Sequence, residues 1–282
     1  MWAVDVYDGA PHEVSAFLAG GTKKVGVYAF VLLFLGPVLF VVAPATSATG
    51  RFHETLQLTL ALLAVATMTV GNVLALMQRE MKRLLAYSSI SQAGYMLLGI
   101  AVGTAPALAG TTFQVFAHVF LKSGAFIVVA AAAGLGVGPL VSDWRGIGVR
   151  RPLLGASFAL MLLGLAGIPL TIGFFSKFIL FSSAVEAQGL FLWLALAGVL
   201  NSALSVFYYG RVLKVMYMDR AAPGEEPLPT PESRGLALGG IGLGRGAAIA
   251  VCVGAILAFG LDPGPILTVF QAGASHLLTL GV

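Results

Sequence analysis

The residue with the most telling position in this sequence is Lys177. It lies in an apolar run, residues 166–181, that is interrupted by Pro169 and Gly173. A proline lacks the backbone N–H and breaks the helical hydrogen-bond ladder, and lipid offers no replacement partner. A lysine at membrane depth costs about 2.5–3.5 kcal/mol on insertion scales, and such residues mark ion and proton pathways. A broken helix beside a buried amine therefore predicts a proton-handling or ion-handling site.

A second set of polar residues lies on one predicted helix face. Gln114, His118 and Lys122 are spaced i, i+4 and i+8, which places them on a single stripe. An amine buried away from water gains and loses its proton more easily near neutral pH, and imidazole titrates in that range. We expect His118 and Lys122 to form a relay segment. The alternative for His118 is a structural hydrogen bond to a neighbouring helix.

Two further lysines, Lys23 and Lys24, lie about 15 Å into the first predicted span. Because adjacent helical residues point about 100° apart, only one of them can face a given polar axis. The other either extends its amine toward the membrane surface or contacts another subunit. The residues themselves leave this choice open.

Hydroxyl side chains form weaker candidates. Tyr87, Ser91 and Tyr95 share an i, i+4, i+8 stripe, and Asn201, Ser202 and Ser205 form a second polar group. These side chains could hold water or join neighbouring helices. Small and polar residues at helix contacts are ordinary in membranes, so we favour packing and keep Tyr87 and Ser91 as supporting residues only.

The elements that position these residues follow from composition. The chain has 282 residues, of which 58% are hydrophobic and 10% charged, whereas soluble domains carry roughly 25% charged residues. This composition predicts an all-α polytopic membrane protein. The apolar runs predict seven spans, at residues 14–42, 55–77, 84–102, 107–133, 152–187, 190–218 and 246–261. A straight helix over the fifth run would be about 54 Å long, against a hydrocarbon core of ~30 Å, so we expect a break at Ile168–Pro169.

The positions of the basic residues predict the orientation. One side of the predicted membrane holds Arg79, Lys82, Arg83, Arg145, Arg150, Arg151, Arg211, Lys214, Arg220, Arg234 and Arg245, and the other holds only Arg51. This asymmetry predicts a cytoplasmic start at residues 1–13 and an outer tail at residues 262–282. Residues 219–235, rich in proline and acidic residues, are expected to form a solvated cytoplasmic loop. We expect one transmembrane domain over residues 1–282.

Several classes of function are excluded. The single cysteine, Cys252, excludes a disulfide framework, an iron–sulfur cluster and a cysteine zinc site within this chain. We find no Walker A pattern, paired carboxylates or metal-ligand cluster, and we therefore expect no bound metal or cofactor. The basic residues are spread over short loops without a basic arm, which excludes nucleic-acid binding.

Three stretches carry a family resemblance: residues 82–95, residues 166–177, and residues 2–11 with the following 15–18. They resemble the antiporter-like, proton-conducting subunits of respiratory complex I. Residues 201–211 point to the N subunit among these. The glycine- and alanine-rich composition with Thr22-Lys-Lys-Val also resembles the N subunit of the archaeal complex that oxidises reduced coenzyme F420.

The resemblance implies residue roles. Lys177 matches the lysine of the second discontinuous helix, at the end of the proton path toward the outside. Lys122 and His118 match connecting residues of the central hydrophilic axis, and Lys23 matches the connecting lysine better than Lys24. The resemblance also implies other membrane subunits as partners, a prokaryotic plasma membrane, and use of quinone and NADH or F420H2 by the whole complex.

The resemblance covers only the second half of a fourteen-helix fold. The glutamate and the broken-helix lysine of the first half-channel are absent, so we expect a truncated product, a mis-assigned start or half of a split gene. Such a chain would supply the second half-channel only.

Two other functions remain open. A multi-subunit cation/proton antiporter shares the fold, although sodium favours carboxylate and carbonyl ligands and no Asp or Glu lies deep in the predicted spans. The third hypothesis is a structural membrane spacer with vestigial lysines.

Overall fold

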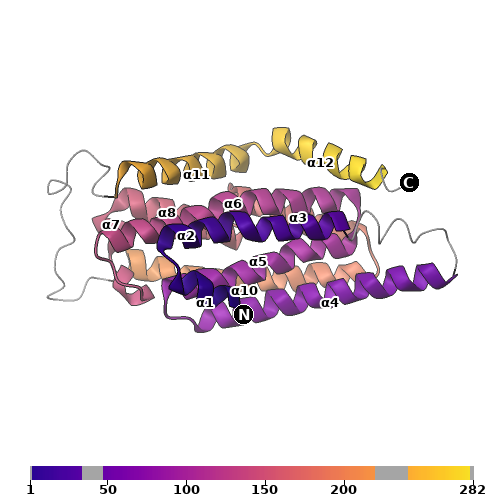
Figure 1. Cartoon of the computed structure of the whole chain (residues 1–282), viewed down its shortest axis with the longest axis horizontal. Coiled ribbons are helices and arrows are strands. Elements are labelled where there is room, and N and C mark those ends of the chain that lie inside the picture. The colour runs from indigo at the N-terminus through magenta and orange to yellow at the C-terminus, as the bar shows by residue number, and fades with distance from the viewer. Residues whose placement is uncertain (1, 34–46, 220–240, 280–282) are drawn as a thin grey trace.

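The computed structural model describes residues 2–33, 47–219 and 241–279, and nearly all of them are helical (Figure 1). The elements are α1 (Trp2–Gly9), α2 (His12–Phe17), the π-helical turn η1 (Leu18–Thr22), α3 (Lys23–Leu33), α4 (Ser47–Met77), α5 (Met81–Val102), α6 (Ala105–Gly134), the 3₁₀ turn η3 (Val141–Trp144), α7 (Ile147–Arg150), α8 (Pro152–Ala166), α9 (Ile172–Glu186), α10 (Leu190–Tyr217), α11 (Leu243–Leu261) and α12 (Gly264–Thr279).

Five of the described helices, α4, α5, α6, α10 and α11, are long and apolar enough to cross a membrane. Two more passes along the molecule are interrupted: α2, η1 and α3 follow one path, and α8 and α9 follow another (Figure 1). The predicted all-α membrane class is confirmed.

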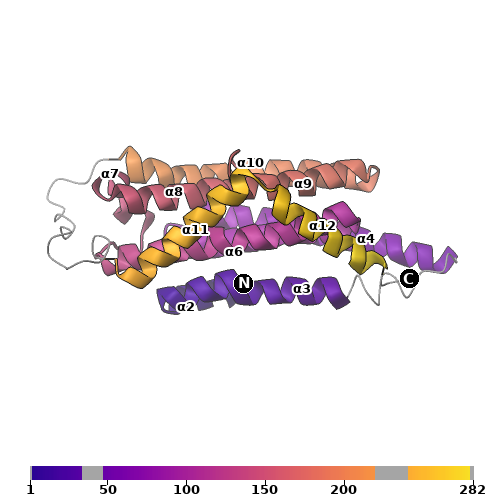
Figure 2. The same cartoon turned by 90° about the horizontal axis from the view of Figure 1, so that it is seen from above.

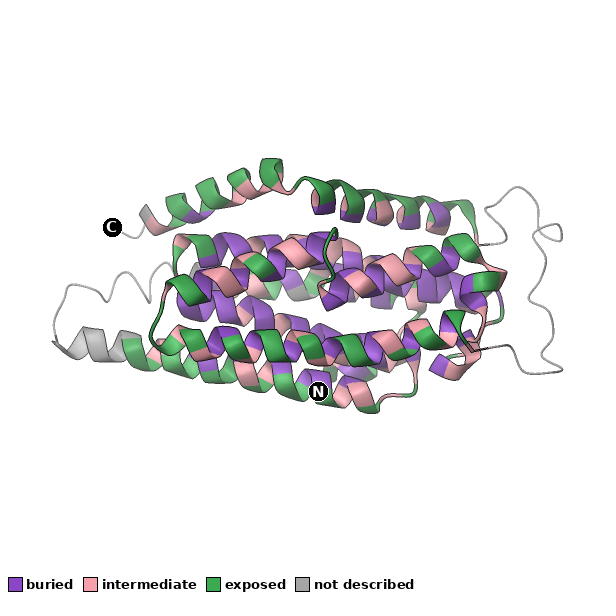
Figure 3. Ribbon diagram, turned by 180° about the vertical axis from the view of Figure 1, so that it is seen from behind, coloured by how far each residue is buried: buried purple, intermediate pink, exposed green. Residues whose placement is uncertain are grey.

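The helices α5 and α6 form the centre of the bundle. Most residues of both helices are buried, and α6 contacts helices on every side, including α5, α9, α11 and α2. Seen from above, α6 runs between α2–α3 on one side and α8–α10 on the other (Figure 2). Buried residues lie on the inward faces of the helices and exposed residues on the outer faces, as Figure 3 shows; large apolar side chains occur on both. Polar groups on the buried faces of α5 and α6 are therefore shielded from solvent.

The predicted break in the fifth span is confirmed. Helix α8 ends in a left-handed Gly167 with φ of +89°, and α9 starts again at Ile172. The link contains Pro169, which cannot donate a backbone hydrogen bond. A Cβ on Gly173 would lie 1.9 Å from the Gly164 carbonyl oxygen, so the two half-helices approach more closely than any side chain allows.

The C-terminal pass is also interrupted, which the sequence did not suggest. Residues 262–282, expected to form an outer tail, contain helix α12, which runs at an angle to α11 and packs on α6 (Figure 2). Asp262 has an extended backbone because Pro263 follows it, and this ends α11. A Cβ on Gly260 would lie 2.6 Å from the Leu170 carbonyl oxygen, so this interruption packs directly on the link between α8 and α9.

The N-terminal segment also differs from the expectation. Residues 1–13, expected to be a cytoplasmic start, contain α1, whose Val4 and Tyr7 side chains are buried at the bundle. Of the expected span 14–42, residues 34–42 lie outside the described chain, and the described part contains the π-helical turn η1. The expected loop 219–235 lies, apart from its first residue, outside the described residues as well.

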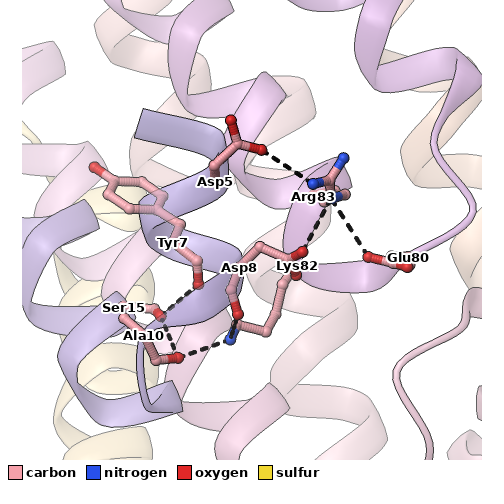
Figure 4. Close-up of polar contacts among 8 residues, drawn as sticks. All are labelled: Asp5, Tyr7, Asp8, Ala10, Ser15, Glu80, Lys82 and Arg83. Carbon is pink, nitrogen blue, oxygen red and sulfur yellow. Dashed lines mark hydrogen bonds and ion pairs between the residues drawn. The ribbon is translucent and has the colours of Figure 1, made fainter. Parts of the chain in front are cut away.

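Side chains of α5 hold α1 in place (Figure 4). Arg83 forms ion pairs with Asp5 and Asp8, each at 3.0 Å. The Lys82 amine donates to the carbonyls of Asp8 and Ala10 at 2.6 and 2.9 Å. The Asp8 carbonyl lies in the last turn of α1 and the Ala10 carbonyl just beyond it, where the helix dipole favours a cation. The ion pairs are partly exposed and therefore screened by solvent, and the buried Val4 and Tyr7 side chains also attach α1 to the bundle.

Candidate functional site

The Lys177 amine is bound at the break that the sequence predicted. Its Nζ donates to the carbonyls of Leu165 and Ala166 at 2.9 and 3.0 Å and to the Ser202 hydroxyl at 3.0 Å. Leu165 and Ala166 close α8, and the last carbonyls of a helix have no partner within the helix. The negative end of the helix dipole lies at the same point. The broken helix therefore provides a binding site for an ammonium group.

The protonated form of Lys177 fits this site fully. An ammonium group has three donors, and three oxygens accept from it. The amine also lies 4.8 Å from the centroid of the Tyr95 ring, a favourable position for a cation. The neutral amine keeps only two donors, so loss of the proton removes one of the three hydrogen bonds that the amine donates at the break.

A chain of amides joins this site to the stripe on α6. Gln92 on α5 donates to the Leu165 carbonyl at 3.1 Å, and Gln114 on α6 donates to the Gln92 side-chain oxygen at 2.7 Å. Ser176, next to Lys177, donates to the Gln114 side-chain oxygen at 2.5 Å. Gln114, which the sequence marked as supporting, is thus two hydrogen bonds from the carbonyl that holds Lys177.

Lys122 occupies the other end of this stripe. Its side chain is fully buried, and its Nζ donates to the Leu85 carbonyl at 3.0 Å and to the Ser88 hydroxyl. His118 is buried between Gln114 and Lys122, one turn of α6 from each. Hydrogen bonds join Lys177 to Gln114, and His118 and Lys122 continue the buried polar row along α6. We call these four residues, with the polar side chains that contact them, the polar band.

The pair Lys23 and Lys24 lies beside the π-helical turn. Lys24 is buried, and its Nζ donates to the Ala19 carbonyl at 2.6 Å. The turn packs on α6, because a Cβ on Gly20 would lie 1.6 Å from the Ser123 hydroxyl oxygen. Ser123, which follows Lys122 in the sequence, donates to the Ala16 carbonyl of α2 at 3.2 Å. Lys23 begins α3, and its side chain is outside the described part of the structure, so its role stays a prediction.

The remaining supporting residues have structural contacts. Ser91 donates within α5 to the Ser88 carbonyl at 2.9 Å, and a Cβ on Gly71 of α4 would lie 2.5 Å from the Ser91 nitrogen. Tyr87 is partly buried against the apolar core. Pro169 is exposed in the link between the half-helices. Tyr87 and Ser91 thus contribute to packing between helices, the role that the sequence favours for both residues.

Sequence reasoning missed four side chains of the polar band: Ser88, Gln92, Ser176 and Ser202. Ser202 was attributed to packing. A usable signal existed for Ser88, Gln92 and Tyr95, because their spacing of i, i+4 and i+7 places them on one face of α5. The predicted stripe shares only Tyr95 with this face. Its other two members, Tyr87 and Ser91, each lie one residue before Ser88 and Gln92 in the sequence.

This chain is similar to several known proteins. The family model described as "NADH:quinone oxidoreductase/Mrp antiporter, TM" matches residues 1–205. The F(420)H(2) dehydrogenase subunit N of Methanosarcina mazei is 40% identical over 99% of this chain. NADH-quinone oxidoreductase subunit N of Trichlorobacter lovleyi is 45% identical over 80% of this chain. A chain of respiratory complex I from Thermus thermophilus superimposes with a TM-score of 0.69, at 32% identity over 95% of this chain.

These proteins are longer than this chain, which covers 53% of the Methanosarcina relative, 43% of the Trichlorobacter relative and 53% of the Thermus chain. The match extends over α1 to most of α10, and so includes every residue of the polar band described above. This chain belongs to the NADH:quinone oxidoreductase/Mrp antiporter transmembrane family.

Proposed function

We propose that this chain is the part of an N-type antiporter-like subunit that moves protons through a membrane, within a quinone-reducing respiratory complex. The proposal rests on Lys177, whose amine is held by the open end of a broken helix and linked through Gln92 to α6. Redox chemistry with quinone and NADH or F420H2 takes place in other subunits of that complex. This chain contributes no redox group.

In this proposal each side chain of the polar band has a role. Lys122 and Lys177 hold the proton at the two ends, and His118 with the hydroxyls of Ser88 and Ser176 passes it between them. Gln92 and Gln114 fix the distance between the ends through their direct amide bond of 2.7 Å. Lys177 is the exit toward the outer side, with the N-terminus of the chain cytoplasmic and the C-terminus outside in a prokaryotic plasma membrane.

The test is the replacement of Lys177 by methionine in the assembled membrane complex. Methionine keeps the length and apolar stem of the side chain and removes the titratable amine. We expect electron transfer to continue with a strongly reduced number of protons pumped per electron, measured by pH-dye fluorescence in proteoliposomes. Lys214→Met is the matched control, because Lys214 is an exposed lysine in the last turn of α10.

An unchanged proton-to-electron ratio in the Lys177→Met complex would refute the proposal and favour the spacer hypothesis. A second measurement separates loss of function from loss of the complex: the amount of assembled enzyme, read from native gels, is expected to be equal for both variants.

The second candidate function is cation/proton exchange, because the matched family description also names Mrp antiporters. Sodium ions added to the same proteoliposomes distinguish the two functions. Proton movement that requires sodium and is accompanied by sodium uptake would replace the pump hypothesis with the antiporter hypothesis.

A further inference from the structure

A network of buried amides joins α4 to α10. Asn72 on α4 is fully buried, and its amide nitrogen donates at 3.0 Å to both the main-chain oxygen and the side-chain oxygen of Asn201 on α10. The Asn72 side-chain oxygen accepts from the Tyr208 hydroxyl, also on α10, at 3.0 Å. Asn201 completes the network by donating to the Thr69 hydroxyl of α4 at 3.2 Å and to the Ala197 carbonyl at 3.0 Å. The three hydrogen bonds of the Asn72 amide are thus all made with α10.

Apolar packing alone does not fix how α10 is turned about its own axis. The outer face of this helix carries exposed apolar side chains, among them Leu196, Leu200 and Phe207. Lipid tails are as apolar as these side chains, so a helix in a membrane gains little from holding one apolar face rather than another against its neighbours. Polar contacts between helices supply the missing specificity. Because Asn72 holds two atoms of Asn201, its grip resists both rotation and sliding of α10.

The residue after Asn201 is Ser202, which contacts the broken helix. Adjacent helical residues point about 100° apart, so α10 faces α4 with Asn201 and the end of α8 with Ser202. The Ser202 hydroxyl donates to the Ala166 carbonyl at 3.1 Å and accepts from the Lys177 amine at 3.0 Å. The orientation that Asn201 fixes therefore sets the distance between the Ser202 oxygen and the amine.

The Asn72 contact lies at the same level of the bundle as the Lys177 site. The Tyr95 hydroxyl is near the side chains of both Asn72 and Ser202. The ring of the same tyrosine lies 4.8 Å from the Lys177 amine. A change in the contact between α4 and α10 at this level therefore acts where the amine is bound.

We propose that Asn72 is a positioning residue for proton transfer at Lys177. It acts through Asn201 and Ser202, and none of the three hydrogen bonds of the amine involves Asn72 itself. A shift of Ser202 by about 1 Å lengthens its 3.0 Å contact with the amine to about 4 Å, beyond hydrogen-bonding distance. The inference rests on the proposed function, since it concerns the proton-carrying group named there.

The test is Asn72→Leu in the complete membrane complex. Leucine has a similar branched shape and neither donates nor accepts a hydrogen bond. We expect the pumping rate to fall about fivefold, as in Ser202→Ala, because both variants remove the same hydrogen bond from the amine. The double variant with Asn72→Leu and Ser202→Ala is expected to pump at the rate of Ser202→Ala alone. A residue that acts only through Ser202 has no further effect once that hydroxyl is absent.

Arg211→Met is the matched control. Arg211 also joins α10 to α4, donating to the Leu76 and Gln78 carbonyls at 3.0 and 2.5 Å. It lies nine residues from Ser202, about 13 Å along the helix. We therefore expect this variant to pump at the wild-type rate.

Asn72→Ser is the second variant, for use if the leucine variant does not assemble on native gels. The serine hydroxyl is about one bond too short to reach Asn201, so the same fall in pumping is expected. A map of the assembled variant is expected to show the Ser202 hydroxyl beyond hydrogen-bonding distance of the Lys177 amine.

The outcomes separate this inference from the proposed function. Wild-type pumping by the Asn72 variants, or a Ser202–Lys177 contact that stays at its original length in the map, would refute the positioning role and leave the proposed function standing. A double variant whose loss is the product of the two single losses would show that Asn72 acts independently of Ser202, and an equal loss in Arg211→Met would attribute the effect to general loosening of α10; either result overturns the inference. Normal pumping by Lys177→Met would instead refute the proposed function.

Discussion

Replacing Gly173 by alanine tests whether the geometry of the broken helix controls proton transfer. The added Cβ would lie 1.9 Å from the Gly164 carbonyl oxygen and 2.8 Å from its carbonyl carbon, which are backbone atoms of α8. Carbon and oxygen atoms without a bond approach to about 3.2 Å or more, so the start of α9 must move away from α8 by more than 1 Å. Gly173 lies four residues before Lys177, one helical turn away.

The displacement acts on the hydrogen bonds of Lys177. A movement of about 1 Å lengthens its 2.9 and 3.0 Å contacts with Leu165 and Ala166 to roughly 4 Å, beyond hydrogen-bonding distance. Misplacement of a reacting group by 1 Å can cost about a hundredfold in rate, so we expect the Gly173→Ala complex to lose nearly all pumping. Overpacking is also expected to destabilise the bundle by about 1–3 kcal/mol.

The assay is the proton-to-electron ratio of the assembled complex in proteoliposomes, together with its thermal unfolding. Gly254→Ala is the control, because Gly254 lies in α11 with no atom within 4 Å of an added Cβ. In that variant we expect wild-type pumping and equal or slightly higher stability. Wild-type pumping by Gly173→Ala would show that the contact between the half-helices does not set the position of the Lys177 amine.

Three other variants have distinct expected results. Ser202→Ala removes the hydroxyl acceptor of Lys177, and we expect a roughly fivefold slower pumping rate with normal assembly, measured in proteoliposomes; an unchanged rate would show that the carbonyls alone hold the amine. Lys122→Met is expected to stop pumping while quinone reduction continues, and retained pumping would remove Lys122 from the path. Glu13 accepts hydrogen bonds from its own backbone N–H and from Arg245, and these bonds hold the pKa of its carboxyl below the usual range. The Glu13–Arg245 ion pair therefore stabilises the fold above the usual pKa of a glutamate, and this stabilisation is lost as the pH falls through the lowered pKa. Because the pair is mostly exposed, Glu13→Gln should lower stability at neutral pH by less than about 1 kcal/mol and remove this acid dependence of the melting temperature; an identical pH profile for variant and wild type would contradict this.

The break and the buried lysines could be predicted from the sequence because each depends on local information. A proline within an apolar run too long for a bilayer sets the break, and the cost of lysine in lipid assigns Lys177 and Lys122 to the interior. The spacing on α6 also placed Gln114, His118 and Lys122 on one face, as the structure has them.

The contacts between helices could not be predicted in the same way. The role of Ser202 depends on how α10 packs on the end of α8, and Gln92 reaches the Leu165 carbonyl only through the packing of α5 against the break. The helix α12 was missed because Pro263 ends α11 and the following residues are less uniformly apolar. Which face a helix presents and how its neighbours are arranged are set by the whole bundle, and short polar stripes do not contain that information.

The contact of Gly260 with the link between α8 and α9 has a mechanical consequence. The link cannot rotate toward α11 without pushing the C-terminal pass aside, because the Leu170 carbonyl already occupies the space of a side chain at position 260. An opening of the Lys177 site that moves the link toward α11 therefore requires α11 to slide or tilt as well. The α8–α9 pass and the α11–α12 pass are therefore mechanically coupled at this contact, and a cross-link between them would restrict the movement of both.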